Sequence, residues 1–508
     1  MIGVVLALLI LPLAAGITCA VLPARTVRAA AAVTVASGIG CFALVLALVP
    51  AAAHHDLSYL SYLRVDAVSA IFLLATGFLY AAVAVYAVGY LRRHEELYAR
   101  RFYAGLNLFA WSMLAAPLMS SLALLWIAVE VTTIISALLV AIEAVSTDGG
   151  DGAAEAAWKY VLIASSGLSL ALLGTVFAYY AGSQVLGEHY NLAIEPLILA
   201  GPHLPATPVR LAFLLALLGY GTKVGLFPVH TWLPDAHSEA PTPVSALLSG
   251  SLLAVSFYAI LRFYQVAAAA LGTGLPRDAL LAFGVASLLL AALYVFGQRD
   301  IKRLLAYSSV EHMGILTIGV SFGAPAALAG VMLHVLAHAA AKGNAFMGAG
   351  VLVAKFGSKQ ISALRGGLDL LPWSGPLFLL AVFALSALPP SGIFRSEFQI
   401  VYGGFGSGHG TAAAVLIVLV TVAFFGLSAS ATRMLFSPAP RRARPAQSRP
   451  APSRPAPSRP APRRGEPSAW MVIPVLAGVA VLFILGLHPP AELTGLISRA
   501  VTQLRATR

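Results

Sequence analysis

A lysine lies inside an apolar stretch that also contains several prolines. Lys223 occurs in the run LALLGYGTKVGLFPVHTWLPDAHSEAPTPVSALLSG, which extends over residues 215–250. The run contains four prolines: Pro228, Pro234, Pro241 and Pro243. A charge at the centre of a membrane helix costs roughly 2.5–3.5 kcal/mol on insertion scales, so it is rarely kept without a function. We predict that Lys223 transfers protons, and we include His230 of the same run in the set.

Further ionisable side chains lie within or at the ends of apolar runs. They are Glu130 in LALLWIAVEVTTIISALL, Glu311 and His312 in LAYSSVEHMGILTIG, and Arg395 and Glu397 in LSALPPSGIFRSEFQIV. The alternative to proton transfer is hydrogen bonding between helices, or snorkelling of a long side chain to the interface. We favour that alternative for Arg395, which stands at the end of a span, and a functional role for Glu130, which lies deep in one.

Three ionisable side chains share one helix face in the run VMLHVLAHAAAKGNAF. His334, His338 and Lys342 follow one another at a spacing of four residues. Imidazole changes its charge near neutral pH and both ring nitrogens exchange protons, so this row is typical of a proton wire. The alternative to a proton wire is a zinc site. Two histidines are too few ligands for one, and no nearby carboxylate or cysteine completes it. We therefore predict no metal.

The prolines suggest broken helices at membrane depth. Pro228, Pro234 and the pair Pro389–Pro390 are expected to interrupt the seventh and twelfth apolar spans. Broken helices are tolerated there only where the freed backbone faces protein or a wet cavity. Breaks five spans apart indicate two repeats of five helices, and an odd number gives the repeats opposite orientations. Lys223 then lies beside one break and Glu397 beside the other.

The composition requires a membrane around these elements. The chain has 508 residues, of which 59% are hydrophobic and 10% charged, with a mean hydropathy of +0.87. Soluble domains have roughly 25% charged residues, so an ordinary soluble fold is excluded. Two cysteines are too few for a disulfide framework or an iron–sulfur cluster. The first residues, MIGVVLALLILPLAAG, lack the basic start of a secretory signal, and we expect a retained first span.

A span needs roughly 20 apolar residues, and by that rule we expect an all-α polytopic membrane protein with about fourteen spans. They lie near residues 2–22, 29–50, 66–90, 103–118, 121–142, 158–180, 209–230, 243–266, 278–297, 304–322, 326–353, 374–394, 411–432 and 469–487. The predicted parts are spans 1–3 (1–102), the first inverted repeat (103–266), the second (278–436), a linker (437–468), and the last span with its tail (469–508). The tail from Pro489 is expected to be a short interfacial helix.

The basic residues predict the orientation. If the connection after span 1 is cytoplasmic, the opposite connections hold only four arginines, namely Arg64, Arg210, Arg262 and Arg277. This asymmetry follows the positive-inside rule and places both termini away from the cytoplasm of a plasma (inner) membrane. Nine arginines between Arg433 and Arg464 account for most of the formal net charge of +12. Their RPAPS repeats are typical of a disordered basic loop near anionic lipid, which we favour over nucleic-acid binding.

Four motifs together resemble a known family. KVGLFPVHTWLPDAHSEAPTPVSALLSG, QRDIKRLLAYSSVEHMGI, HVLAHAAAKGNAFMGAG and LPPSGIFRSEF are similar to the antiporter-like membrane subunits of respiratory complex I, multisubunit sodium/proton antiporters and group 4 membrane-bound nickel–iron hydrogenases. The resemblance covers roughly residues 66–430. The segment AYSSVEHMG most resembles the hydrogenase-4 component F branch.

The resemblance implies a role for each matching residue. Glu130 corresponds to a glutamate that modulates the lysine at Lys223, and His334, His338 and Lys342 correspond to a central hydrophilic axis. Glu397 corresponds to the group that exchanges protons with the outer side. Two further residues, Asp300 and Lys302, correspond to a polar turn before span 10.

Two features depart from the family pattern. Relatives commonly have a lysine or histidine in span 8, near Ala254 here, where this chain offers only hydroxyls: Ser249, Ser251, Ser256 and Tyr258. Waters held by these hydroxyls are the expected substitute in the step from Lys223 to His334. The proline–arginine linker is also unlike the family.

The resulting hypothesis is proton translocation driven by electron transfer in partner subunits. Those partners are expected to be other membrane subunits and soluble redox or hydrogenase subunits on the cytoplasmic side, as in hydrogenase-4, formate hydrogenlyase or NADH–quinone oxidoreductase. The chain shows no flavin, nucleotide or cluster motif, so we predict no cofactor in it. The alternatives are a subunit of an Mrp-type sodium/proton antiporter, an ion-translocating partner of a bicarbonate-uptake protein, and a passive scaffold. Lysine and histidine repel sodium, which favours protons.

Overall fold

The computed structural model describes residues 1–144, 151–438 and 463–505, and these are almost entirely helical. The first helices are α1 (Ile2–Val21), α2 (Val27–His54), α3 (Ala67–Tyr90), α4 (Glu96–Ala115), α5 (Leu122–Val140), α6 (Asp151–Leu186), α7 (Ile194–Leu199), α8 (Ala206–Val224), α9 (Trp232–Glu239), α10 (Thr242–Leu247) and α11 (Leu253–Leu271). They are followed by α12 (Gly274–Tyr294), α13 (Ile301–Phe322), α14 (Pro325–Phe356), α15 (Gly367–Leu370), α16 (Ser374–Leu385), α17 (Gly392–Gly406), α18 (Gly410–Phe436), α19 (Ala469–Leu487) and α20 (Ala491–Arg505). Strands β1 (Leu57–Tyr59) and β2 (Leu63–Val65) form a short antiparallel hairpin.

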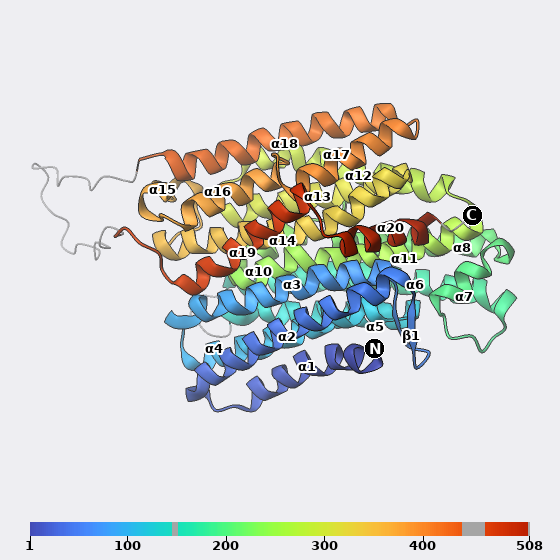
Figure 1. The fold of residues 1–508 in the computed structure, drawn as a ribbon, viewed down its shortest axis with the longest axis horizontal. Coiled ribbons are helices and arrows are strands. Elements are labelled where there is room, and N and C mark those ends of the chain that lie inside the picture. The colour runs from blue at the N-terminus through green and yellow to red at the C-terminus, as the bar shows by residue number, and fades with distance from the viewer. Residues whose placement is uncertain (145–150, 439–462, 506–508) are drawn as a thin grey trace, which may run out of the picture.

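The predicted spans are all present as helices. Ten helical segments within the described ranges are long and apolar enough to cross a membrane. The other four predicted spans are α4, α8 with α9, α13, and α16 with α17, which carry polar residues or a break. The all-helical, multi-pass fold is therefore confirmed. Figure 1 shows the long helices lying side by side, with α15 at one end of the bundle and β1 and α7 at the other.

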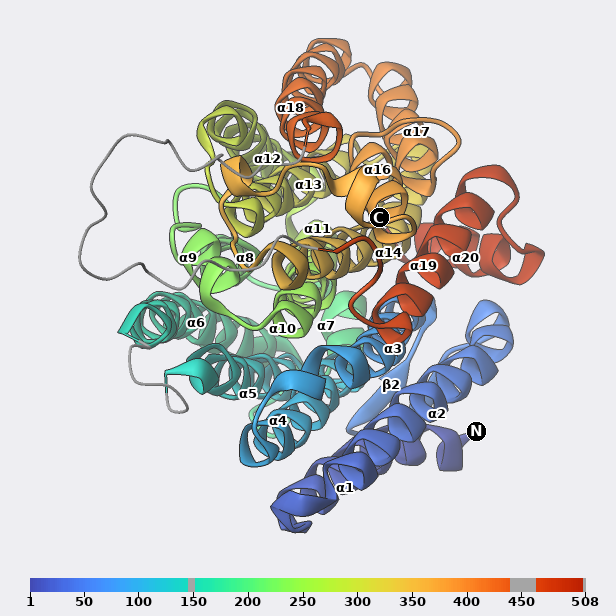
Figure 2. The same cartoon turned by 90° about the vertical axis from the view of Figure 1, so that its left-hand side faces the viewer.

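Two helices are broken at corresponding places. α8 and α9 are separated by residues 225–231, and α16 and α17 by residues 386–391. α8 starts at the end of the bundle near α7, whereas α16 starts at the end near α15, so the two broken spans run in opposite directions (Figure 1). Viewed from the end of the bundle, α4–α6 lie on one side and α12, α13 and α16–α18 on the other, with α3 and α14 between them (Figure 2). This arrangement agrees with the expected inverted repeats, whose exact boundaries stay a prediction.

The segment after the first break differs from expectation. We expected Pro234 to break a helix, but it lies within Trp232–Glu239, which form α9. Pro234 stands in the first turn of this helix, where a backbone N–H has no intrahelical acceptor and proline is tolerated. Pro228, Pro389 and Pro390 do lie in the two breaks. Both breaks contain a cis peptide bond, at Phe227–Pro228 and Pro389–Pro390.

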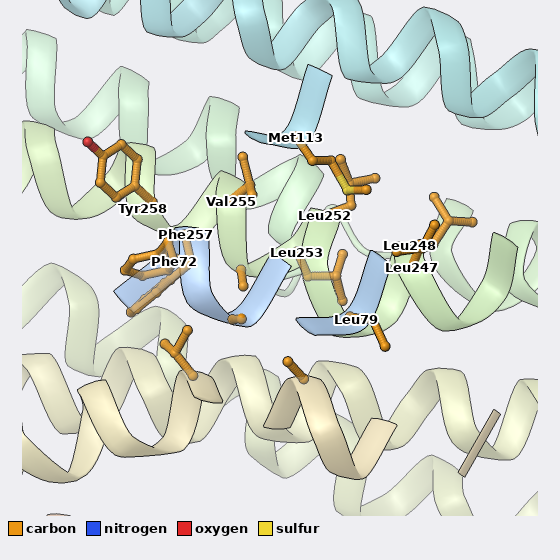
Figure 3. Packing of buried hydrophobic residues seen from close by; sticks show 14 of the residues in the cluster. Phe72, Leu79, Met113, Leu247, Leu248, Leu252, Leu253, Val255, Phe257 and Tyr258 are labelled. Carbon is orange, nitrogen blue, oxygen red and sulfur yellow. The ribbon is translucent and has the colours of Figure 1, made fainter. Parts of the chain in front are cut away.

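A close approach of three helices lies at the middle of the bundle. Span 8 consists of α10, a π-helical turn over Leu248–Leu252, and α11. Leu79 of α3 inserts between this turn and α14: a Cβ atom on Gly250 or on Gly343 would lie 2.5 Å from a methyl group of Leu79. Figure 3 shows Leu79 and Phe72 packed among the apolar side chains of span 8. Glycine at these two positions thus brings span 8 and α14 close together beside Lys342.

A buried ion pair ties α3 to α11. Both carboxylate oxygens of Asp66 accept hydrogen bonds of 2.7 Å from Nη2 of Arg262, and Oδ1 also caps α3 by accepting from the backbone N–H of Ser69 at 2.8 Å. We counted Arg262 as a charge of an outer connection, but it lies buried within α11. Burial alone would raise the pKa of Asp66, but the charge and hydrogen bonds of Arg262 outweigh it and lower this pKa to about 2.

We expect Asp66→Asn to destabilise the fold. Asparagine can still cap α3, but it leaves the guanidinium of Arg262 buried without a countercharge, which costs roughly 3–5 kcal/mol. Thermal unfolding in detergent measures the loss. The native carboxylate stabilises the fold above its ordinary pKa of 3.8, and this contribution is lost as the pH falls toward about 2. The exposed Asp278, changed to asparagine, serves as the control; an equal change in melting temperature for both variants would contradict the prediction.

The C-terminal helix closes the bundle on the side of the hairpin. Asp56 accepts hydrogen bonds of 2.8 Å from Arg499 and from Gln503 of α20, and its other oxygen accepts one of 2.8 Å from Arg64. The tail is thus helical, as expected.

The predicted disordered linker (437–468) needs one correction. Its residues 439–462 lie outside the described residues, but its last residues are ordered. Glu466 accepts hydrogen bonds of 2.9 and 3.0 Å from the backbone N–H groups of Trp373 and Ser374 at the start of α16. A carboxylate at a helix N-terminus satisfies free N–H groups and complements the helix dipole, which explains why this end of the segment is fixed.

Candidate functional site

The first break is satisfied by neighbouring helices. α8 ends at Gly225, whose φ of 82° lies in the left-handed region that glycine adopts without strain. The N–H of Phe227 donates to the hydroxyl of Ser287 on α12 at 2.9 Å, and the indole N–H of Trp232 donates to the carbonyl of Thr222 at 2.7 Å. Backbone groups in an apolar surrounding need such partners. The break therefore has a defined conformation, and its hydrogen bonds fix the end of α8, where Lys223 lies.

Lys223 is fully buried and bonded to hydroxyl groups. Its Nζ donates to Thr133 of α5 and, at 3.0 Å, to the phenol oxygen of Tyr160 on α6. Tyr160 in turn lies 2.8 Å from the hydroxyl of Ser136. These contacts form a short chain of groups that exchange protons.

Glu130 lies near this chain but does not pair with the lysine. Its Oε1 accepts a hydrogen bond of 2.9 Å from Ser165, and its Oε2 is buried with no hydrogen-bond partner among the described residues. We expected Glu130 directly beside Lys223; no ion pair within 4.0 Å joins them in the described part of the chain. The reason is that Thr133, one helical turn after Glu130, occupies the place next to the ammonium group.

A second cluster lies where α13, α14 and α17 meet. Nδ1 of His312 is 3.1 Å from Nε2 of His334, and Nδ1 of His334 is 2.9 Å from the hydroxyl oxygen of Ser396. Ser396 donates its own proton to the carbonyl of Ile393 at 2.8 Å. Ser396 must therefore accept from His334, so the proton of a neutral His334 is on Nδ1 and its Nε2 accepts from His312. This leaves Nε2 of His312 as a bare acceptor.

The remaining members of the predicted axis surround this pair. The ring of His338 lies 5.2 Å from that of His312, and neither of its nitrogens has a hydrogen-bond partner within the described ranges. Oε1 of Glu397, beside the second break, is 3.9 Å from Nδ1 of His312. Glu311 is also buried on α13. The fold thus places Glu397 close to the histidines, a neighbour that the sequence spacing does not reveal.

Lys342 extends the cluster toward the first break. Its Nζ donates to the carbonyl of Leu305 at 3.1 Å and to the hydroxyl of Ser308 on α13. The next residue on that helix, Ser309, lies 2.7 Å from Ser249 of the π-helical turn in span 8. Span 8 is therefore hydrogen-bonded, through the hydroxyl of Ser249, to the part of α13 that also contacts Lys342.

The other hydroxyls of span 8 point elsewhere. Ser251 donates to Thr76 at 2.8 Å, Ser256 bonds the carbonyl of Leu252, and Tyr258 contacts Ser69. Of the four hydroxyls predicted to bridge the repeats, Ser249 is the one bonded to α13 in the described structure.

One buried histidine of α9 was missed by the sequence analysis. His237 is fully buried, its ring lies 5.2 Å from that of Phe346, and neither ring nitrogen has a partner in the described part of the chain. Phe346 is one turn beyond Lys342 on α14. His230 is also buried, in the first break, between Phe227 and Tyr307. The signal for His237 was its place in the same proline-rich run as Lys223.

A polar cavity lies at the α15 end of the bundle. It has a volume of about 710 Å³, and its lining includes His94, Glu143, Glu239, Lys302 and Lys359. Lys302 also donates to the carbonyl of Ala240 at 2.8 Å. Lys302 of the predicted polar turn before span 10 thus lines a cavity that adjoins the end of α9.

Known proteins are similar to this chain in sequence and in fold. Residues 119–425 match the family described as NADH:quinone oxidoreductase/Mrp antiporter, TM. The chain is 36% identical over 368 residues to a hydrogenase-4 component F homolog of Methylacidiphilum infernorum (isolate V4), covering 71% of this chain and 76% of the relative. It is 29% identical to NADH-quinone oxidoreductase subunit N of Desulforudis audaxviator (strain MP104C), covering 86% and 84%. A chain in the structure of the Mrp complex from Dietzia sp. DQ12-45-1b has the same fold, with a TM-score of 0.84 and 22% identity over 99% of this chain and 98% of that one. The chain therefore belongs to the NADH:quinone oxidoreductase/Mrp antiporter transmembrane family.

Proposed function

We propose that the chain is a proton-translocating, antiporter-like membrane subunit of a multisubunit redox complex of the hydrogenase-4 type. The observation that carries this proposal is a set of buried protonatable side chains that extends from the first helix break to the second. Its members are Lys223, Lys342, His338, His334, His312 and Glu397. The hydrogenase-4 component F homolog and the NADH-quinone oxidoreductase subunit among its relatives support a redox partner. Electron transfer is assigned to those partner subunits. The cavity beside Lys302 is assigned to the cytoplasmic side because the basic residues gather at that end, which leaves both termini on the other side.

The geometry supports an ordered proton transfer. Lys223 holds a proton between Thr133 and Tyr160, and Glu130 stands one helical turn before Thr133 on α5. When partner subunits shift the charge around Glu130, the proton leaves toward Ser249 and Ser309 and reaches Lys342 through water.

The last part of the path is the histidine pair. A proton that arrives at the bare Nε2 of His312 allows the proton on Nδ1 to move to His334 or to Glu397, which are 3.1 and 3.9 Å away. Each transfer moves one proton over a short distance and requires no large displacement of a helix. Glu397 stands beside the second break, from which the proton leaves on the outer side.

The identity of the transported ion is tested with the complete complex in sealed proteoliposomes. During turnover of the redox partner we expect a pH gradient in sodium-free buffer, and no uptake of radioactive sodium when sodium is present. Lys342→Met removes the ammonium group that links the two halves and is expected to abolish the gradient. Lys159→Met is the control, because Lys159 is partly exposed and, in the described structure, its ion pair is with Glu155 on its own helix. Sodium uptake that is driven by an imposed pH gradient and needs no redox turnover would instead support an Mrp-type antiporter subunit.

A further inference from the structure

The second cluster, which the proposed proton path uses, also brings together atoms that can bind a metal ion. One ligand atom each from His312, His334 and Glu397 lies within 4.8 Å of the other two. The three residues come from three helices, α13, α14 and α17, and all are buried. We propose that they form a binding site for a divalent transition-metal ion such as zinc.

The distances suit such an ion. Zinc binds imidazole nitrogen and carboxylate oxygen at roughly 2.0–2.2 Å, so neighbouring ligand atoms in a tetrahedral site are roughly 3.3 Å apart. Nδ1 of His312 is 3.1 Å from Nε2 of His334 and 3.9 Å from Oε1 of Glu397. Small side-chain rotations therefore suffice to place all three atoms around one ion.

The hydrogen bond between His312 and His334 engages two of the three ligand atoms, and both are released when the proton of His312 moves from Nδ1 to Nε2. Ser396 fixes the proton of His334 on Nδ1, so Nε2 of His334 presents its lone pair toward the site. This is the arrangement by which a second partner orients a metal-binding histidine. Oε1 of Glu397 is buried and has no hydrogen-bond partner among the residues that the structure describes. His312 becomes a ligand through Nδ1 when its proton moves to Nε2, which is likewise unpartnered there.

The ligand types define the class of ion. Two imidazoles and one carboxylate favour zinc, cobalt, nickel or copper over magnesium and calcium, which prefer oxygen ligands. The carboxylate of Glu397 supplies one negative charge against the two positive charges of the ion. The bound metal takes the place of the proton shared by His312 and His334, so it is expected to block transfer between them; this inhibitory effect rests on the proposed function, whereas the binding itself does not.

Metal binding is tested with the purified full chain in detergent after treatment with a chelator. Titration with cobalt is expected to give one bound ion per chain, with the visible absorption bands of a four-coordinate cobalt site, and zinc is expected to displace it. His312→Gln, His334→Gln and Glu397→Gln should each weaken binding at least about 100-fold, and zinc should no longer raise the melting temperature of these variants. The measurement needs no redox partner, so its failure is distinct from a failure of proton transport.

Two histidine variants serve as controls. His203→Gln changes an exposed histidine, and His338→Gln changes a buried histidine on the same helix as His334. Both are expected to keep cobalt binding. Wild-type chain that binds no cobalt would overturn the proposal without reference to any variant, and so would unchanged binding after substitution of the three ligands.

Discussion

Lys223→Ala is expected to abolish proton transport by the assembled complex. The side chain is fully buried between Thr133 and Tyr160, so alanine removes the group that holds the proton at the first break and leaves nothing to replace it. Loss of a positioned proton-transfer group lowers a rate by roughly 100-fold or more. The rate of formation of the pH gradient in proteoliposomes measures the effect, and native electrophoresis of the complex shows whether assembly is retained.

Two further variants sharpen this result. Lys159→Ala changes a partly exposed lysine of α6, and this variant is expected to transport at the wild-type rate. Glu130→Gln is expected to slow transport strongly as well, although Glu130 acts on Lys223 across Thr133 and not through an ion pair. Undiminished transport by Lys223→Ala in an assembled complex would remove this residue from the path.

His312→Gln is expected to have a similarly large effect in the second half. His312 is the residue whose Nδ1 lies within 4 Å of both His334 and Glu397, so it connects the central axis to the second break. Glutamine fills a similar volume and keeps hydrogen-bonding groups, but its amide does not carry a proton at neutral pH. We expect proton transport to fall roughly 100-fold, measured in the same vesicles.

The matched control for this prediction is His203→Gln. His203 is exposed near α7, and its replacement should leave transport unchanged. Equal transport by the two variants would mean that protons reach the second break by another route. A loss in both would indicate a general defect of the preparation.

Much of the fold could be predicted because the membrane restricts it. Apolar length located fourteen helical segments, of which ten in the described residues are long and apolar enough to cross a membrane, and the prolines at 228, 389 and 390 located both breaks. Pro234 was misread, since a proline within the first turn of a helix looks in the sequence like a proline that ends one. Arg262 was assigned to a connection because its partner, Asp66, is 196 residues away in the chain.

The site was predicted less completely, for a geometric reason. Helical spacing places His334, His338 and Lys342 on one face, because that is a property of a single helix. The approach of Glu397 to His312 depends on how α17 packs against α13 and α14. The separation of Glu130 from Lys223 depends on one hydroxyl, that of Thr133, and the contact of Ser249 with Ser309 depends on a π-helical turn. Local sequence patterns do not encode such contacts between helices.

The hydrogen bonds between Asp56 and α20 have a consequence for the order in which the helices assemble. Asp56 and Arg499 are 443 residues apart in the chain, and they join the hairpin after α2 to the helix after α19. Because a ribosome makes the chain from the N-terminus, this contact forms only after α1–α19 have been synthesised. Until then, α2 and the hairpin that follows it lack the contact with α20. The side of α2 and the hairpin that α20 covers in the folded chain stays uncovered until that contact forms.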